Sequence, residues 1–363
     1  MILTAKIRLQ PTPYQYTTLL ETLENANAVC NYASEQAWEH RIFRQYPLHH
    51  LVYRDARERF SLGAQVVVRA IGKVADAYKL DRRAKRTFAP RGAFPYDNKN
   101  LSFKTDERTV SIWTLEGRQY MPYLCGERQN ELLEGKRGEA DLCCINGEFY
   151  LFVACEVGTP EPEDVDDFLG VDLGIVNIAS DSDGEVFSGE QVEETRRKFA
   201  HRRRNLQRNG TRASKRKLRN IRHKQSRYQT DVNHRISKAI VQKAKRTGRG
   251  IALEILKGIT RRVRVSRKQR ARLHNWSFGQ LASFVQYKAK LAGMPVMFVD
   301  PKYTSQTCSV CGHIDKRNRP DQSTFSCVSC GFSASADTNA AVNIAVRAVV
   351  NQPNGLFAQG SVA

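Results

Sequence analysis

The sequence lacks any long hydrophobic run: none of its apolar stretches approaches the roughly 18 to 20 residues that a membrane-spanning helix needs. Its first residues also lack the apolar core of a secretory signal peptide. These absences predict a soluble protein that stays in the cytoplasm. A hydrophobic content of 41% is still ample for packed cores, and 363 residues predict two or three domains.

Acidic residues are scarce relative to basic ones. The chain has 37 Asp and Glu against 58 Lys and Arg, which gives a formal net charge of +21 and a pI near 9.8. A charge of this size does not specify a fold, but it indicates a polyanionic partner. Because no lipidation signal or amphipathic membrane anchor is present, nucleic acid is favoured over a membrane surface.

The strongest basic run, residues 196–224, contains fourteen Lys and Arg and no acid. Such a block is usually a solvated or disordered face. Here Phe199 and Leu218 are among the apolar residues that interrupt it, and Asn209-Gly210 can form a hinge, so we predict an anchored pair of basic helices. A second basic run covers residues 257–272.

Both runs are expected to bind phosphates with a salt-sensitive affinity that does not depend on base sequence. The expected contact residues are Arg196, Arg197, Lys198, Arg202, Arg203, Arg204, Lys215, Arg216, Lys217, Arg222, Lys224, Arg261 and Arg262.

Three carboxylates interrupt segments that otherwise have the character of buried elements. Asp172 lies inside the apolar run FLGVDLGIVNIA between Gly170 and Gly174, Glu254 interrupts IALEIL, and Asp337 opens the segment ADTNAAVNIA. A buried carboxylate costs several kcal/mol unless it is compensated. Each residue has a simpler explanation, as a hydrogen-bonded Asp, a Glu paired with a lysine, or a helix cap.

Taken together, the three acids favour a metal site. Mg²⁺ prefers oxygen ligands, and two such ions about 3.5–4 Å apart can activate water and stabilise a leaving oxygen in phosphodiester cleavage. The glycines flanking Asp172 would let a phosphate backbone approach the strand.

The nine cysteines fall into two groups. Cys308, Cys311, Cys327 and Cys330 form the pattern C-x₂-C-x₁₅-C-x₂-C, which is typical of a closed tetrahedral zinc ribbon and therefore predicts a structural Zn²⁺. A glycine follows each pair, where the turn favours positive φ. The remaining five, which we expect to be small buried hydrophobes, are Cys30, Cys125, Cys143, Cys144 and Cys155.

Hydrophobic periodicity divides the chain into a strand-rich first part and an α/β second part. The predicted elements are a strand at 2–9, helices at 14–40 and 62–80, short strands between 94 and 157, a Pro- and acid-rich linker at 158–167, a single strand at 168–179 with a short return strand at 185–189, helical structure at 190–248, a strand at 249–256, a helix at 276–293, a strand at 294–300 and a helix at 336–350.

The motifs GVDLGIVNIA, ALEILKGI, the four-cysteine segment and SADTNAAVNIA, in this order, resemble the split RuvC nuclease of the TnpB family. These are transposon-encoded, RNA-guided DNA endonucleases related to type V CRISPR effectors. The resemblance covers residues 165–350. It implies an α/β RNase H-like (RuvC) nuclease domain with an inserted zinc ribbon, in which Asp172, Glu254 and Asp337 are catalytic and hold two Mg²⁺ ions.

The resemblance also implies an N-terminal β-barrel-like wedge domain with a helical recognition insertion. The implied boundaries are 1–10 and 90–160 for the wedge domain, 11–89 for the insertion, 165–350 for the nuclease domain, 304–334 for the ribbon and 351–363 for a flexible tail. The implied partners are a guide RNA from the transposon end and a double-stranded DNA target, chosen by base pairing and a short adjacent motif. We expect a monomer.

Three other functions fit the same residues. They are a catalytically silent RNA-guided DNA-binding regulator, a DNA-joining transposase and a miniature type V CRISPR effector. The intact acid trio disfavours the regulator. Relatives often carry an acid after the second-motif glutamate, whereas this chain has Ile255, for which we expect a change of packing and not a loss of activity.

Overall fold

The computed structural model describes residues 1–135, 137–256 and 278–352. The chain divides into two compact units, Met1–Gly158 and Thr159–Ala363. Each unit has its own hydrophobic core. Within the described residues, no helix combines the length and the apolar character that crossing a bilayer requires.

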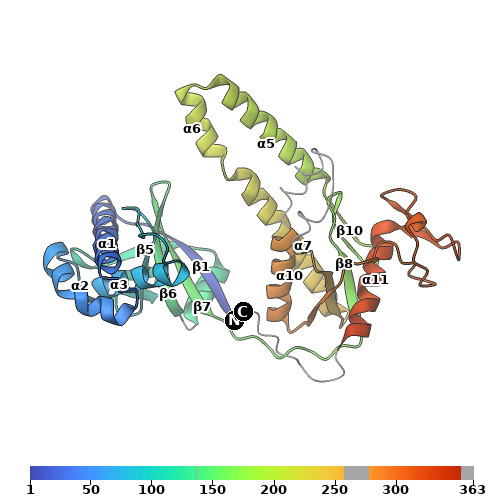
Figure 1. The fold of residues 1–363 in the computed structure, drawn as a ribbon, viewed down its shortest axis with the longest axis horizontal. Coiled ribbons are helices and arrows are strands. Elements are labelled where there is room, and N and C mark those ends of the chain that lie inside the picture. Colours follow the sequence, from blue (N-terminus) through green and yellow to red (C-terminus); the bar gives the residue numbers. More distant parts are fainter. Residues whose placement is uncertain (136, 257–277, 353–363) are drawn as a thin grey trace. The chain divides into compact units, whose positions relative to one another are not determined.

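The first unit is built on a seven-stranded antiparallel sheet with the order β2-β6-β7-β1-β5-β4-β3 (Figure 1). Its strands are β1 (Ile2–Leu9), β2 (Phe94–Tyr96), β3 (Leu101–Lys104), β4 (Thr109–Thr114), β5 (Gly117–Leu124), β6 (Arg137–Ile145) and β7 (Glu148–Glu156). In β1 the alternation points Ala5, Ile7 and Leu9 into the core. Asn146 and Gly147 both have positive φ, as a two-residue hairpin turn between β6 and β7 requires.

The described residues of the first unit form four helices. They are α1 (Pro13–Glu39), α2 (Gln45–Phe60), α3 (Ala64–Leu80) and α4 (Glu127–Glu134). Three of them pack on the unit's sheet, and α2 packs on α1 and α3. A capping box starts α1, because Thr12 accepts a hydrogen bond from the Gln15 N–H and the Gln15 side chain accepts one from the Thr12 N–H. The sequence predicted α1 and α3 but missed α2, which is rich in charge and buries only Leu48, Val52 and Ala56 at a spacing of four.

The second unit is built on a mixed five-stranded sheet with the order β10-β9-β8-β11-β12. Its strands are β8 (Phe168–Asp172), β9 (Asn177–Asp181), β10 (Val186–Ser188), β11 (Gly250–Glu254) and β12 (Val296–Val299). β8, β11 and β12 are parallel, while β9 and β10 are antiparallel additions. Helices α7 (Lys224–Arg246) and α10 (Phe278–Ala292) lie on one face and α11 (Ala336–Asn351) on the other (Figure 1).

The prediction of one strand over residues 168–179 was wrong. The segment folds as β8, a turn and β9, which pair antiparallel with Asp172 opposite Ser180. The turn is tight: the Gly174 N–H donates to the Ile178 carbonyl, and a Cβ at Gly174 would lie 2.6 Å from the Asn177 carbonyl oxygen. Asp172 therefore ends a strand and does not occupy its middle.

The role expected for Gly170 was also wrong. A Cβ at Gly170 would lie 1.9 Å from the carbonyl oxygen of Ala341 and 2.7 Å from the amide nitrogen of Ala345. The backbone of α11 therefore occupies the space beside this glycine, and no phosphate can approach there. Gly170 allows α11 to pack directly on β8, which sets the position of the first turn of α11.

A pair of basic helices extends from the second unit's sheet, as the sequence predicted (Figure 1). They are α5 (Glu190–Asn209) and α6 (Arg212–Ile221), which we call the basic arm. The hinge lies at Gly210, whose φ of 60° is in the left-handed region. Ser214 and Ile221 are buried on one side of α6, so its cations face solvent on the other.

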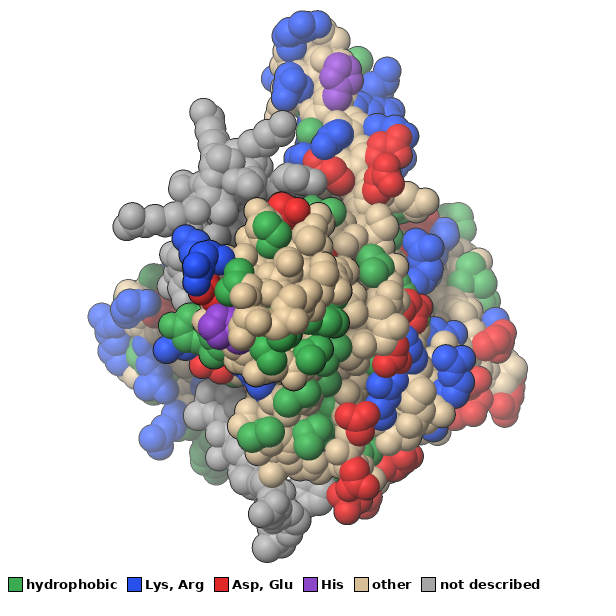
Figure 2. Space-filling model, turned by 90° about the vertical axis from the view of Figure 1, so that its right-hand side faces the viewer, with side chains coloured by type: hydrophobic (Ala, Val, Ile, Leu, Met, Phe, Trp, Pro, Cys, Tyr) green, Lys and Arg blue, Asp and Glu red, His purple; other side chains and the backbone are tan. Residues whose placement is uncertain are grey.

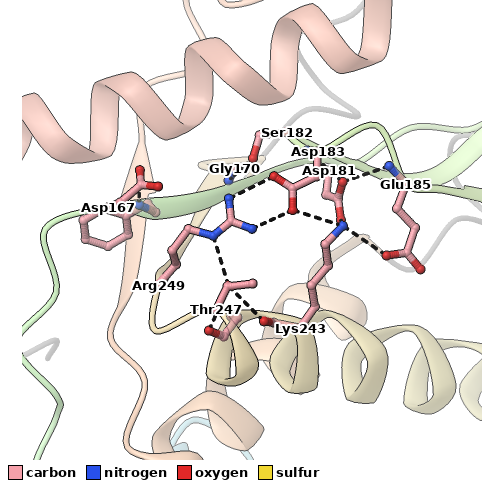
Figure 3. A network of polar contacts seen from close by, with 11 residues as sticks. Asp167, Gly170, Asp181, Ser182, Asp183, Glu185, Lys243, Thr247 and Arg249 are labelled. Atoms are coloured by element: carbon pink, nitrogen blue, oxygen red, sulfur yellow. Dashed lines mark hydrogen bonds and ion pairs between the residues drawn. The ribbon is translucent and has the colours of Figure 1, made fainter.

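A polar network fixes the β9–β10 hairpin to α7 and to the start of β11 (Figure 3). Asp181, which is 1% exposed, forms an ion pair with Lys243 and accepts hydrogen bonds from the N–H groups of Asp183 and Glu185 at 3.0 and 2.9 Å. Arg249 donates to both carboxylate oxygens of Asp183 at 2.9 and 2.6 Å. The network anchors the end of the sheet opposite to the carboxyl end of β8.

This network predicts an acid-sensitive contribution to stability. Hydrogen bonds from Arg249 hold the pKa of Asp183 at about 2, below the value of about 3.9 of an unfolded chain. A depressed folded pKa stabilises the fold above pH 4, and this contribution is lost as pH falls from about 4 towards 2. Asp183→Asn should therefore lower the melting temperature at pH 7, with a gap to wild type that narrows below pH 4. A gap that does not depend on pH would contradict the ion pair.

Candidate functional site

Two of the three predicted acids end neighbouring parallel strands. Val171 of β8 is aligned with Leu253 of β11, so Asp172 and Glu254 each occupy the next position at the carboxyl edge of the sheet. Parallel neighbours of this kind lie about 4.8 Å apart along the hydrogen-bonding direction. This register follows from the two apolar runs, each of which ends in its carboxylate.

The third acid, Asp337, comes from the last described helix of the second unit. Asp337 lies in the first turn of α11, which packs on β8 through Gly170. The side-chain amide of Asn177, at the start of β9, donates to Asp337 Oδ2 at 2.8 Å. The structure therefore brings Asp172, Glu254 and Asp337 to one edge of one sheet.

The carboxylates are close enough for the charges of Glu254 and Asp337 to influence the pKa of Asp172. Burial raises the pKa of Asp172 to about 7, and the charges of Glu254 and Asp337 add to the rise, while Arg319 from the cysteine segment opposes it. Burial also raises the pKa of Glu254, against the lowering effect of the Thr304 hydroxyl. Carboxylates in such a field are stabilised by a cation between them.

The carboxylates do not form a closed single-ion cage. Among the described residues, the four ribbon cysteines are the one group of three or more His, Cys, Asp or Glu ligands whose atoms all lie within 4.8 Å of one another. The acid trio is more widely spaced.

Sequence analysis missed the residues that hold the acids in place. Thr304, which is buried, donates its hydroxyl hydrogen bond to Glu254. The Thr304 carbonyl accepts from the Asn343 side chain at 2.9 Å, and both Asn339 and Asn343 donate to the Thr307 carbonyl. The signal in the sequence was the pair of asparagines, four residues apart, in an otherwise apolar helix.

The four ribbon cysteines converge as predicted. Cys308 Sγ lies 3.7 Å from Cys330 Sγ, and Cys311 Sγ lies 3.6 Å from Cys327 Sγ. A tetrahedron of Zn–S bonds of about 2.3 Å places its sulfurs about 3.8 Å apart, so the group can bind zinc. The glycines after each pair, Gly312 and Gly331, have φ of 75° and 76°, as the turns require. The ribbon contains η1 (Lys316–Asn318), β13 (Thr324–Ser326) and β14 (Ser333–Ser335).

The other cysteines are only partly as expected. Cys30 and Cys155 are buried, but Cys125, Cys143 and Cys144 are partly exposed. The expectation failed for these three because they lie in the loop after β5 or near the end of β6, where apolar sequence does not ensure full burial.

The predicted phosphate-binding residues differ in whether their side chains already interact with another side chain. Arg196 and Arg197 pair with Glu193, Lys198 pairs with Glu194, and Arg203 donates to Gln225. The next seven are exposed and, within the part of the chain that the structure describes, pair with no carboxylate: Arg202, Arg204, Lys215, Arg216, Lys217, Arg222 and Lys224. Arg261 and Arg262 lie outside the described residues.

The space-filling view shows basic side chains at one end of the second unit. Figure 2 shows Lys and Arg side chains gathered at its upper end, where Figure 1 shows α5 and α6. The basic arm thus exposes cations that, within the described residues, pair with no carboxylate: Arg202, Arg204, Lys215, Arg216 and Lys217.

Two family models match the second unit and the end of the first. The model described as "Probable transposase" matches residues 152–252, which include β8 and Asp172. The model described as "Cas12f1-like, TNB domain" matches residues 278–344, which include the ribbon and Asp337.

Curated relatives extend these matches. A CRISPR-associated endodeoxyribonuclease Cas12f1 of Sulfoacidibacillus thermotolerans is 35% identical over 50% of this chain and 46% of its own length. A putative RNA-guided DNA endonuclease, InsQ, of Escherichia coli (strain K12) is 28% identical over 73% of this chain and 71% of its own length. A TnpB-like protein of Methanocaldococcus jannaschii is 34% identical over 31% of this chain and 41% of its own length. The chain thus spans about half the length of the Cas12f1 relative.

The fold matches a solved structure described as the Cas12f1-sgRNA-target DNA complex, determined by cryo-EM. The TM-score is 0.65 at 16% sequence identity, over 92% of this chain and 83% of that chain. The likeness shows a shared fold. In sequence, the chain is similar to Cas12f1 endodeoxyribonucleases, to an RNA-guided DNA endonuclease and to TnpB-like proteins.

Proposed function

We propose that the protein is an RNA-guided DNA endonuclease of a transposable element, which hydrolyses DNA phosphodiesters at Asp172, Glu254 and Asp337. The observation that carries this proposal is the arrival of three carboxylates from β8, β11 and α11 at one sheet edge, where burial and mutual repulsion raise the pKa of Asp172 to about 7. The names of its relatives, among them an RNA-guided DNA endonuclease, support the same activity.

The residues around the trio have separate tasks in this proposal. Mg²⁺, when bound, would activate a water molecule and stabilise the leaving oxygen. Asp172, Glu254 and Asp337 would supply the oxygen ligands. Asn177 orients the Asp337 carboxylate and Thr304 orients that of Glu254. The guanidinium of Arg319 adds positive potential beside Asp172, which favours the approach of a phosphate.

The remaining parts of the chain would bind the nucleic acids. We assign the seven-stranded sheet to a wedge domain and α1 to α3 to a recognition insertion, with the ribbon at 304–334 as a structural zinc module inside the nuclease domain. A guide RNA would select a double-stranded DNA target by base pairing, next to a short motif read by the protein. We propose that the protein acts as a monomer.

The basic arm gives a testable part of this assignment. Replacing Lys215, Arg216 and Lys217 together with alanine should weaken nucleic-acid binding and reduce the slope of log K against log[salt] by about 0.7 to 0.9 per lost phosphate contact. The arm should still fold, because these side chains are exposed and unpaired. Electrophoretic mobility shifts across a salt series measure the slope. Lys198→Ala, which removes a cation already paired with Glu194, is the matched control and should change it less. An unchanged slope in the triple variant would exclude the arm from binding.

The experiment that tests the function starts from the host locus. The protein is purified from cells that carry its genomic surroundings, and any RNA that copurifies is sequenced. Double-stranded DNA complementary to that RNA is then incubated with the complex and Mg²⁺. We expect cuts that leave 5′-phosphate ends and depend on the RNA. Binding without cutting would indicate the regulator, and strand transfer into a second DNA without RNA would indicate the transposase.

A further inference from the structure

The backbone is strained at one aromatic residue beside the acids. Tyr303 has a φ of 65°, in the left-handed region that bulky residues rarely adopt. Four other non-glycine residues in the described ranges have positive φ, and Tyr303 is the one aromatic among them. Strain of this kind persists where the surrounding structure enforces it, often at functional sites.

The strained turn at Tyr303 explains how Thr304 is positioned, but it does not explain why residue 303 is aromatic. The Tyr303 carbonyl accepts hydrogen bonds from the N–H groups of Gln306 and Thr307 at 2.9 and 3.0 Å and from the Thr307 hydroxyl at 2.8 Å. This turn directs Thr304 to Glu254. Glycine or asparagine would adopt the same backbone with less strain, so the turn alone gives no reason for a tyrosine.

The Tyr303 ring also makes few contacts that would stabilise the fold. The Tyr303 residue is 47% exposed, and its recorded ring contact is with the ammonium group of Lys302, 5.1 Å from the ring centroid. Tyr303 lies in the loop after β12, which ends level with Glu254, and its neighbour Thr304 donates a hydrogen bond to Glu254. An exposed aromatic face beside a cation is the combination that single-stranded nucleic acid binds, by stacking and by phosphate contact.

Two further apolar side chains lie on the loops at this edge. Val176, in the turn after β8, is 52% exposed, and Ile255, directly after β11, is 45% exposed. Ile255 is exposed because β11 ends at Glu254, directly before it. Val176 and Ile255 thus add exposed apolar surface to the loops at this edge.

We propose that Tyr303 is the stacking platform for one nucleobase of the DNA strand whose phosphodiester lies at the acid trio. Lys302 contacts the phosphate next to that base. The inference rests on the proposed nuclease function, and it requires an unpaired base at Tyr303, because a base in a duplex is already stacked on both faces.

The test uses three versions of the full-length chain, each with Asp172→Asn so that no cutting occurs. They carry Tyr303, Tyr303→Phe or Tyr303→Asn. Binding is measured with single-stranded DNA that contains 2-aminopurine, whose fluorescence falls on stacking. We expect Tyr303→Phe to bind as the tyrosine version does. Tyr303→Asn should bind roughly 10-fold more weakly, the scale of one lost base–aromatic stack, and should show less quenching. Its melting temperature should not fall, because asparagine tolerates the turn.

Equal binding and quenching by the asparagine and tyrosine versions would overturn the inference. A second measurement locates the contact: photocross-linking with single-stranded DNA that carries 5-iododeoxyuridine should yield an adduct on Tyr303, and adducts confined to other residues would also overturn it. The outcome is separable from that of the proposed function. If binding depends on the ring but the wild-type protein never cuts DNA, the nuclease function is refuted and the stacking role of Tyr303 is retained. If the protein cuts DNA but binding does not depend on the ring, the nuclease function is retained and the stacking role is refuted.

Discussion

Replacing Asp172 with asparagine is expected to reduce DNA cleavage roughly 10²- to 10³-fold, the scale on which removal of a single charge-stabilising group acts in an enzyme site. The asparagine keeps the shape of the side chain but removes a charged metal ligand. Nucleic-acid binding should be retained, since the basic arm is unchanged. Cleavage of a labelled target and mobility shifts on the same preparations measure the two effects.

The same variant has an expected effect on stability that a loss of folding could not imitate. The folded pKa of Asp172 is about 7, above the unfolded value of about 3.9, so the ionised carboxylate destabilises the metal-free fold above pH 7 and does so less as pH falls towards 4. Metal-free Asp172→Asn should therefore melt higher than wild type at pH 8, by an amount that shrinks towards pH 4. A variant that still cuts DNA, or that melts lower at pH 8, would contradict the site.

Asp300 provides the matched control for this prediction. It follows β12 at the same sheet edge, is exposed and raises the pKa of Glu254, but its carboxylate accepts a hydrogen bond from the Lys302 N–H. Asp300→Asn should retain most of the cleavage. Equal losses of cleavage in Asp172→Asn and Asp300→Asn would show that cleavage depends on negative charge at the sheet edge and not on metal ligation by specific acids.

Cys308→Ser should have the second largest effect, because it removes one ligand from the proposed structural zinc site. Structural zinc in small modules contributes roughly 10–16 kcal/mol of apparent binding free energy, which is also folding free energy. The ribbon's own core is small, with Phe325 and Ala336 beside the buried cysteines. We expect loss of bound zinc, measured by mass spectrometry of the metal, and a lower melting temperature.

The loss should also spread from the ribbon to the acids. Thr304 and Thr307, just before Cys308, connect Glu254 to Asn339 and Asn343 of α11. Cleavage should therefore fall together with zinc content. Cys143→Ser, at a partly exposed cysteine outside the ribbon, is the control and should keep both zinc and activity. A Cys308→Ser protein with full zinc content and unchanged melting would contradict the ribbon.

The sequence predicted the site best where a charged residue interrupts an apolar segment. Asp172, Glu254 and Asp337 stand out because each interrupts an apolar segment, and the four cysteines stand out by their spacing alone. Gly210 was predicted as a hinge because its neighbours on both sides are helical and basic. Such signals depend on a few adjacent residues, so they can be read without knowing which segments meet in space.

Contacts between distant segments could not be predicted in this way. That Gly170 accommodates the backbone of α11 is visible only once the helix lies on β8. The break between β8 and β9 was missed because both halves are apolar and the turn at Gly174 is too short to interrupt the pattern. Asn177 and Thr304 carry no distinctive motif, and their roles depend on partners about 160 and 50 residues away.

Anomalous diffraction from crystals grown with Mn²⁺ tests most directly whether the three acids hold divalent cations at the sheet edge. We predict manganese peaks about 2.0–2.3 Å from carboxylate oxygens of Asp172, Glu254 and Asp337. The peaks should be absent in crystals of Asp172→Asn. Manganese bound elsewhere in the second unit, with this edge empty, would contradict the proposed site.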